Sequence, residues 1–86
     1  MSRSYIRLVE MTNDYKEEEF LSKFAHHLAK TREDKGFTQE QLAAEAGIDR
    51  VALANIETGR RRPTLRTVYR LSRALKIPLK VLFASF

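Results

Sequence analysis

The sequence predicts an all-α fold, a compact bundle of five helices with an N-terminal arm of uncertain structure. Three observations lead to this prediction. Apolar residues recur at helical spacing along most of the chain. Residues that cap helices precede the apolar stretches, and the three Gly and two Pro residues are spaced as breaks between short helices. The chain of 86 residues leaves room for one domain.

The N-terminal residues 1–13 show no decisive pattern. A short strand, a swapped arm and a loose tail all fit them, and we expect the helical domain to occupy residues 14–86. Asp14 followed by Glu17 has the spacing of a capping box. This pair predicts that the first helix runs from about Tyr15 to Lys35.

The expected first helix carries an acidic run and an apolar stripe. The run Glu17–Glu19 would lie in the first turn, where the helix dipole favours negative charge. Phe20, Phe24 and Leu28 follow at intervals of four residues, which predicts that they face the core. Gly36 is expected to end this helix.

Three further helices and a final turn are predicted by their start and stop signals. A side-chain oxygen that can accept a backbone N–H stands before each of the three, and Gly or Pro follows. The expected caps are Thr38 (with Gln41 completing a capping box), Asp49 and Thr64. The third helix is predicted to span Arg50–Thr58, and the final turn Leu79–Phe83. In the fourth, Leu65, Val68, Leu71 and Leu75 form an apolar stripe at helical spacing.

Composition excludes several classes of function. The chain has no Cys, which excludes disulfides and zinc–thiolate sites. No apolar run has the length of a membrane span and the N-terminus lacks a signal-peptide pattern, so we expect a cytoplasmic protein without membrane contact. His26 and His27 have no carboxylate or second His at helical spacing, so no metal site is expected. No catalytic constellation is visible, so neither an enzyme nor a cofactor is expected.

The excess positive charge lies in the second part of the chain. The formal net charge is +5 at pH 7. Residues 1–35 carry seven basic and seven acidic groups, whereas residues 36–86 carry nine basic groups against four acidic ones. Seven of those nine are Arg, whose planar fork suits phosphate. This asymmetry favours a polyanionic partner, with a solvated basic surface as the alternative.

The segment most informative about function is a pair of short helices over residues 39–58. Gly47 supplies the positive φ that a tight turn needs, and Ala43 lets the two helices cross closely. Further apolar residues tie both helices to the core, and one side of the second helix is left free. These residues are Leu42, Ala46, Ile48, Leu53 and Ile56.

This pattern resembles the helix-turn-helix of the phage repressor and Cro family, also called XRE-like, over residues 24–83. The likeness rests on four strings in register: Arg32-x-x-x-Gly36-Phe37-Thr38-Gln39-Glu40-Gln41-Leu42-Ala43, Gly47-Ile48, Ile56-Glu57-Thr58-Gly59 and Arg62-Pro63-Thr64-Leu65. It implies a lambda-repressor-like bundle and a sequence-specific DNA-binding transcriptional regulator. Such proteins typically act as homodimers on palindromic operators in double-stranded DNA. A restriction–modification controller and a small phage or plasmid repressor both fit.

The resemblance also implies a role for particular residues. The recognition helix would present Arg50, Val51, Ala52 and Asn55 to base edges in the major groove. Phosphate contacts would come from Thr38, Gln39, Thr58, Arg60, Arg61 and Arg62. Arg32 and Glu57 would form a buried structural ion pair. Leu79, Leu82, Phe83 and Phe86 would form the dimer interface. The alternative is that the C-terminal apolar residues, Val81, Leu82, Phe83 and Phe86, all fold back onto the first helix.

One alternative function stays open at this point. An antitoxin would bind its operator and also mask a toxin protein, with residues 1–13 as the toxin-binding element. The sequence leaves contact with RNA polymerase open as well. It does not distinguish activation from repression.

Overall fold

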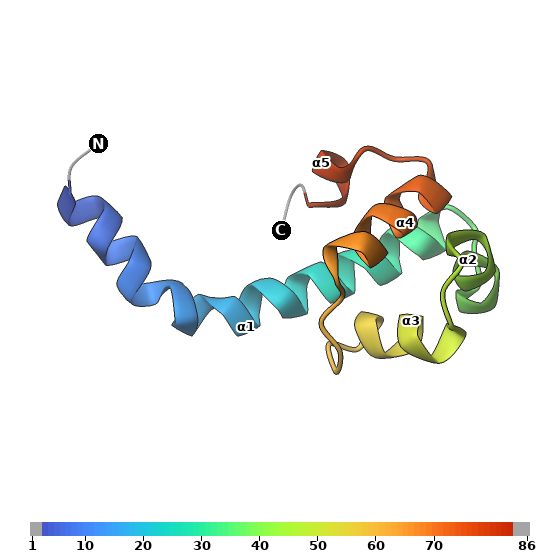
Figure 1. The fold of residues 1–86 in the computed structure, drawn as a ribbon, viewed down its shortest axis with the longest axis horizontal. Coiled ribbons are helices and arrows are strands. Elements are labelled where there is room, and N and C mark those ends of the chain that lie inside the picture. The colour runs from blue at the N-terminus through green and yellow to red at the C-terminus, as the bar shows by residue number, and fades with distance from the viewer. Residues whose placement is uncertain (1–2, 84–86) are drawn as a thin grey trace.

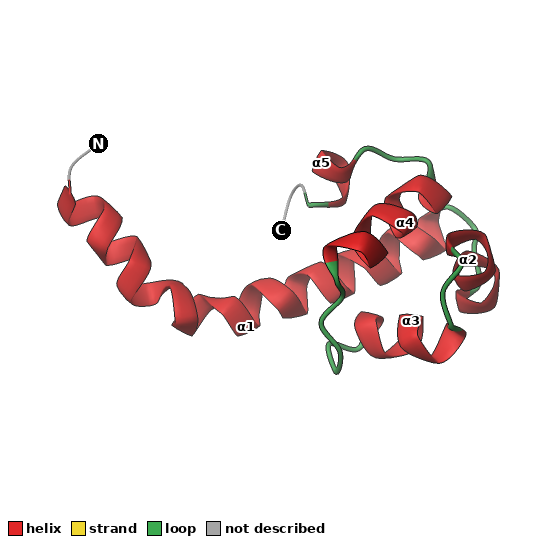
Figure 2. Cartoon of the chain, viewed as in Figure 1, coloured by secondary structure: helices red, strands yellow, loops and turns green. Residues whose placement is uncertain are grey.

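The fold is all-helical, as predicted. The computed structural model describes the backbone of residues 3–83 and the side chains of residues 16–83. No strand occurs among these residues (Figures 1 and 2). The five helices are α1 (Arg3–Asp34), α2 (Gln39–Ala46), α3 (Arg50–Glu57), α4 (Leu65–Leu75) and α5 (Leu79–Leu82).

The first helix is longer than the sequence predicted. α1 begins at Arg3, so the backbone of residues 3–13 is helical and does not form a strand. Asp14 therefore lies inside α1 and is not its N-cap, and Glu17–Glu19 are not in the first turn. The physical reason is that no Gly or Pro occurs before Gly36 to interrupt the helix. The N-terminal part of α1 extends beyond the other helices (Figure 1).

The predicted caps of the short helices are confirmed. The Oγ1 atom of Thr38 accepts from the backbone N–H of Gln41 at 3.1 Å, and the N–H of Thr38 donates to Oε1 of Gln41 at 2.9 Å. Thr64 likewise caps α4 through the N–H of Thr67 at 3.1 Å. These bonds satisfy N–H groups that have no partner within the helix, so each helix starts at a defined residue.

The core lies where the C-terminal half of α1 meets the four shorter helices. Six leucines from all five helices are almost completely buried there: Leu28, Leu42, Leu53, Leu71, Leu75 and Leu82. The prediction that Leu82 belongs to a dimer interface is therefore wrong. α5 packs against α4, and this packing turns Leu82 into the core, so its side chain is withdrawn from any partner.

Two residues of the predicted apolar stripes are exposed. Leu65 is 77% exposed at the first position of α4, and Phe20 lies on the surface of α1. Each stands at the N-terminal end of its apolar stripe, and Phe20 is covered only in part, by the ring of Phe83. Phe24 and Leu28, one and two turns further along α1, are buried as predicted.

Two leucines of α4 provide a matched test of this packing. Leu71→Ala should lower the free energy of unfolding by about 2–5 kcal/mol, because Leu71 is fully buried and its truncation leaves a cavity. Leu65→Ala should change it by no more than about 0.5 kcal/mol. Urea denaturation followed by far-UV circular dichroism measures both. Equal losses in the two variants would contradict the placement of α4.

Candidate nucleic-acid interface

The turn between α2 and α3 fixes the direction of α3 relative to α2. Gly47 adopts a left-handed conformation, with φ at 70°. The N–H of Ile48 bonds to the carbonyl of Ala43 at 2.9 Å, which closes the turn. Asp49 then caps α3 by accepting the N–H groups of Val51 and Ala52 at 3.1 and 3.3 Å. The start of α3 is thus fixed by hydrogen bonds to the backbone of Val51 and Ala52, two of the predicted base contacts.

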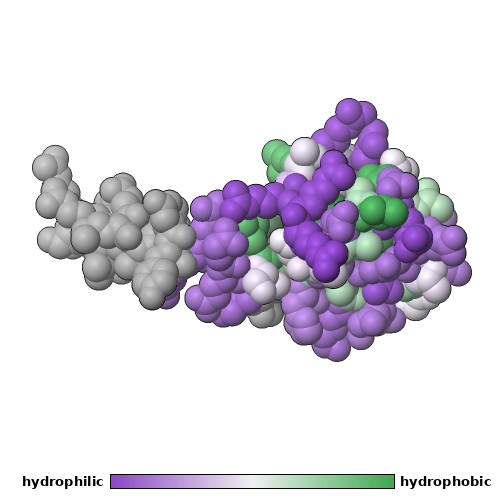
Figure 3. Space-filling view, turned by 90° about the horizontal axis from the view of Figure 1, so that it is seen from below, coloured by the Kyte–Doolittle hydropathy of each residue, from purple (hydrophilic) through white to green (hydrophobic). Residues whose placement is uncertain are grey.

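α3 has one side in the core and one side in solvent. Leu53 and Ile56 are buried against the other helices. On the opposite side Arg50 and Val51 are exposed, while Ala52 and Asn55 are half-buried at its borders. Seen from below, the face of the molecule that carries α3 is largely hydrophilic (Figure 3). The predicted reading side of α3 is therefore accessible to a duplex.

A buried ion pair anchors the C-terminal end of α3. The guanidinium of Arg32 donates from Nε to Oε2 of Glu57 at 2.8 Å and from Nη2 to Oε1 at 3.2 Å. The side chains are only 12% and 4% exposed. Arg32 also donates from Nη1 to the carbonyl of Phe37 at 2.8 Å. This fork joins α3 to α1 and to the loop before α2, so the ion pair has the structural role predicted for it.

Gln39 is also part of this network, which the sequence did not reveal. Its Nε2 donates to Oε1 of Glu57 at 2.9 Å. Glu57 therefore holds the first residue of α2 as well as Arg32 of α1. The second hydrogen of this Nε2 is left for another acceptor. The bond to Glu57 orients the amide of Gln39, a predicted phosphate contact, before any ligand arrives.

The other predicted phosphate contacts differ in their present partners. The hydroxyl of Thr58 donates to the carbonyl of Ala54 at 3.1 Å, and that of Thr38 is engaged in capping α2. Arg60 and Arg61 are exposed and form no ion pair with another described residue. Arg62 instead pairs with carboxylates of α1.

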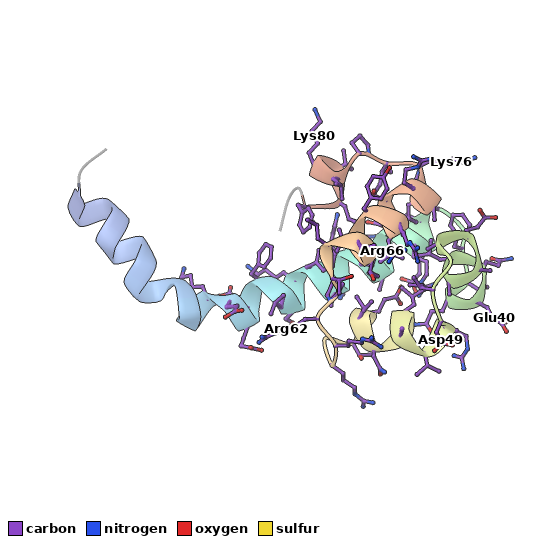
Figure 4. All side chains as sticks on the ribbon, in the orientation of Figure 1. Glu40, Asp49, Arg62, Arg66, Lys76 and Lys80 are labelled. Carbon is purple, nitrogen blue, oxygen red and sulfur yellow. The ribbon has the colours of Figure 1, made fainter. Side chains whose placement is uncertain are left out.

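Every charged side chain that follows α3 in the sequence is basic. No Asp or Glu occurs after Glu57. Eight basic residues lie in the same part of the chain: Arg60, Arg61, Arg62, Arg66, Arg70, Arg73, Lys76 and Lys80. The side chains of Arg66, Lys76 and Lys80 project from α4 and the segment after it (Figure 4). Only the loop arginines lie next to α3, whereas Lys76 and Lys80 lie at the side of the molecule away from α3 (Figure 4).

The predicted dimer residues separate into different environments. Leu79 is half-buried against the core, and Phe86 lies outside the described residues. Phe83 is exposed in part and stacks on Phe24 and Phe20 of α1, with ring centroids 5.1 and 6.5 Å apart. Phe20, Phe83 and Val81 are exposed and leave apolar surface at the junction of α1 and α5, whereas Phe24 is buried.

The described residues hold no group of three or more side chains arranged to bind a metal ion. Within the same part of the chain, no helix combines the length and apolar character needed to cross a membrane.

Comparison with protein families and curated proteins identifies helix-turn-helix regulators. A family model described as helix-turn-helix matches residues 28–82. The chain is 41% identical over 51 residues to the uncharacterized HTH-type transcriptional regulator y4dJ of Sinorhizobium fredii (strain NBRC 101917 / NGR234), covering 59% of this chain and 66% of that protein. It is 35% identical over 48 residues to an uncharacterized HTH-type transcriptional regulator of Archaeoglobus fulgidus, covering 56% and 69%. The match thus spans about two thirds of these relatives.

Similar solved structures are restriction-modification controller proteins. C.AhdI from Aeromonas hydrophila superimposes with a TM-score of 0.70 at 33% identity, covering 74% of this chain and 96% of that one. Wild-type C.Esp1396I gives a TM-score of 0.70 at 33% identity, covering 74% and 84%. Family, relatives and solved structures agree with the resemblance seen in the sequence.

The contribution of the buried Arg32–Glu57 pair to stability can be compared with that of the exposed Lys30–Asp34 pair of α1. Arg32→Leu should lower the free energy of unfolding by about 3–5 kcal/mol, because it leaves the carboxylate of Glu57 buried without its cation. Lys30→Leu removes the partner of Asp34 from a pair that is about two-thirds exposed, and should cost less than about 1 kcal/mol. Thermal and urea denaturation give both values. A loss below about 1 kcal/mol in Arg32→Leu would show that the pair does not anchor α3.

Proposed function

Since the chain belongs to the helix-turn-helix family of DNA-binding transcriptional regulators, we propose that it binds its operator as a homodimer with α3 in the major groove. The chain is thus a regulator and not an enzyme. The observation that carries the proposal is the solvent side of α3, which lies beside an arginine-rich loop. Because a regulator acts where the DNA is, we place it in the cytoplasm.

The proposed sequence readout rests on few polar side chains. Arg50 stands at the start of α3, where a recognition helix points toward base edges, and its fork fits N7 and O6 of guanine. Asn55 has the amide that pairs with adenine, and Val51 or Ala52 has the methyl groups that fit thymine. Because two of these four residues cannot form hydrogen bonds through their side chains, we expect DNA shape to contribute to specificity.

The proposed phosphate contacts surround α3 on both sides. Gln39 and Thr38 lie at the start of α2, where backbone N–H groups favour an anion. Thr58 and the loop residues Arg60, Arg61 and Arg62 lie beyond the end of α3. Contacts on both flanks of the recognition helix would fix its position in the groove.

The proposed dimer uses the apolar surface at the junction of α1 and α5. Phe20, Val81 and Phe83 are exposed large apolar residues of that region, and a partner would cover them. Leu79 and Phe86 complete the proposed interface. A two-fold dimer places its recognition helices about 34 Å apart, which corresponds to half-sites about 10 base pairs apart.

The similar controller proteins support a narrower form of this proposal. C.AhdI is named a restriction-modification controller, and the chain covers 96% of it. We propose that this chain is likewise a small controller of gene expression, governed by the concentration of its own dimer.

A substitution at the start of α3 tests the readout. Arg50→Ala should weaken binding to the selected operator by about 1–3 kcal/mol and relax the preference at one base pair. Selection from a random DNA pool identifies the operator, and fluorescence anisotropy measures affinity on it and on random duplexes. Equal weakening on both would make Arg50 a phosphate contact and contradict its role in base reading.

A second substitution tests the interface. Phe83→Ser should raise the dissociation constant of the dimer at least about tenfold, because it removes apolar area from a small interface. Sedimentation equilibrium measures this constant, and circular dichroism checks that the variant is folded. Val51→Ser, which removes an exposed apolar side chain from α3, should leave dimerisation unchanged. An unaltered dimer in Phe83→Ser would exclude the proposed interface.

A further inference from the structure

Arg62 is held by two carboxylates that lie far from it in sequence. Its Nη2 donates to Oε1 of Glu18 at 2.7 Å, and its Nη1 lies 3.9 Å from Oε1 of Glu17. The contact joins the loop between α3 and α4 to α1 across 44 residues. Figure 4 shows Arg62 beside the part of α1 that extends from the bundle.

This contact distinguishes Arg62 from its two neighbours. Arg60 and Arg61 form no ion pair with any described residue, so their guanidinium groups are free of carboxylates in that part of the chain. All three arginines follow directly on α3. Of three successive cations next to the proposed DNA surface, one is therefore neutralised within the protein.

A carboxylate and a phosphate compete for the same donors of an arginine. Both anions accept the parallel N–H groups of the guanidinium fork, so Arg62 cannot give its full fork to Glu18 and to DNA at once. The side chains of Arg62, Glu18 and Glu17 are 62%, 76% and 51% exposed. Exposed ion pairs of this kind are weak, so a phosphate can displace the carboxylate.

We propose that Glu18, assisted by Glu17, sets the DNA affinity of this protein by occupying Arg62 until a phosphate replaces it. The inference rests on the proposed function, because it needs Arg62 to reach a duplex. In the free protein the carboxylates satisfy the guanidinium. On binding, Arg62 exchanges Glu18 for a phosphate oxygen. Breaking the pair between Arg62 and Glu18 costs free energy, and this cost makes DNA binding weaker than it would be without the pair.

Neutral variants of α1 test the exchange. Glu18→Gln and the double variant Glu17→Gln/Glu18→Gln should bind a selected operator duplex about two- to fivefold more tightly than the wild type, as expected from losing a weak exposed pair. Fluorescence anisotropy at a fixed low salt concentration measures the dissociation constants. Thermal melting confirms that the variants are folded.

Glu19→Gln is the matched control. Glu19 is adjacent, similarly exposed, and paired with Lys23 at 3.1 Å instead of Arg62. Its neutralisation changes the net charge by the same amount, so it should tighten binding less than Glu18→Gln does. Equal tightening would show that only the total charge matters and would overturn the proposal.

The same measurements in an Arg62→Ala background complete the test. There the Glu18→Gln substitution should have no more effect than Glu19→Gln, since the competing guanidinium is gone. An undiminished gain in that background, or weaker binding by Glu18→Gln alone, would also overturn the exchange. If the wild type binds no selected duplex, the proposed function itself fails, and the two failures are thereby distinguished.

Discussion

The position of α3 depends on the buried carboxylate of Glu57. A helix of eight residues is too short to be stable alone, so its direction must come from tertiary contacts. Leu53 and Ile56 attach its inner side to the core, but apolar packing alone permits sliding and rotation. The fork from Arg32 and the amide of Gln39 converge on Glu57 with directional bonds and fix α3 relative to α1 and α2.

Much of the bundle could be predicted because its signals are local. A capping side chain acts within three residues, so Thr38, Asp49 and Thr64 could be recognised from the sequence and are present as caps in the structure. The turn at Gly47 is equally local, since a positive φ depends on that residue alone. These elements place the solvent side of α3, and with it much of the candidate site.

The errors concern features that depend on distant parts of the chain. Asp14 and Glu17 have the spacing of a capping box, which suggested that a helix starts there. This spacing does not stop a helix that begins earlier in the chain, so α1 continues through both residues. Helical spacing defined an apolar face for Leu65 and Leu82 without showing whether another element covers it. The contact between Arg62 and Glu18 joins residues 44 positions apart, and no periodicity reports such a pairing.

The inner side of α3 attaches the helix to the protein, and its outer side is exposed to solvent. Residues that attach it to the protein point inward, and Glu57 closes the helix at its far end. Arg50 and Val51 make no contribution to that attachment and are exposed, so exchanging them has little cost for folding. The outer side of α3 can therefore be exchanged while its inner side stays attached. In the proposed mode of binding, new operator preferences could evolve in this way on an unchanged fold.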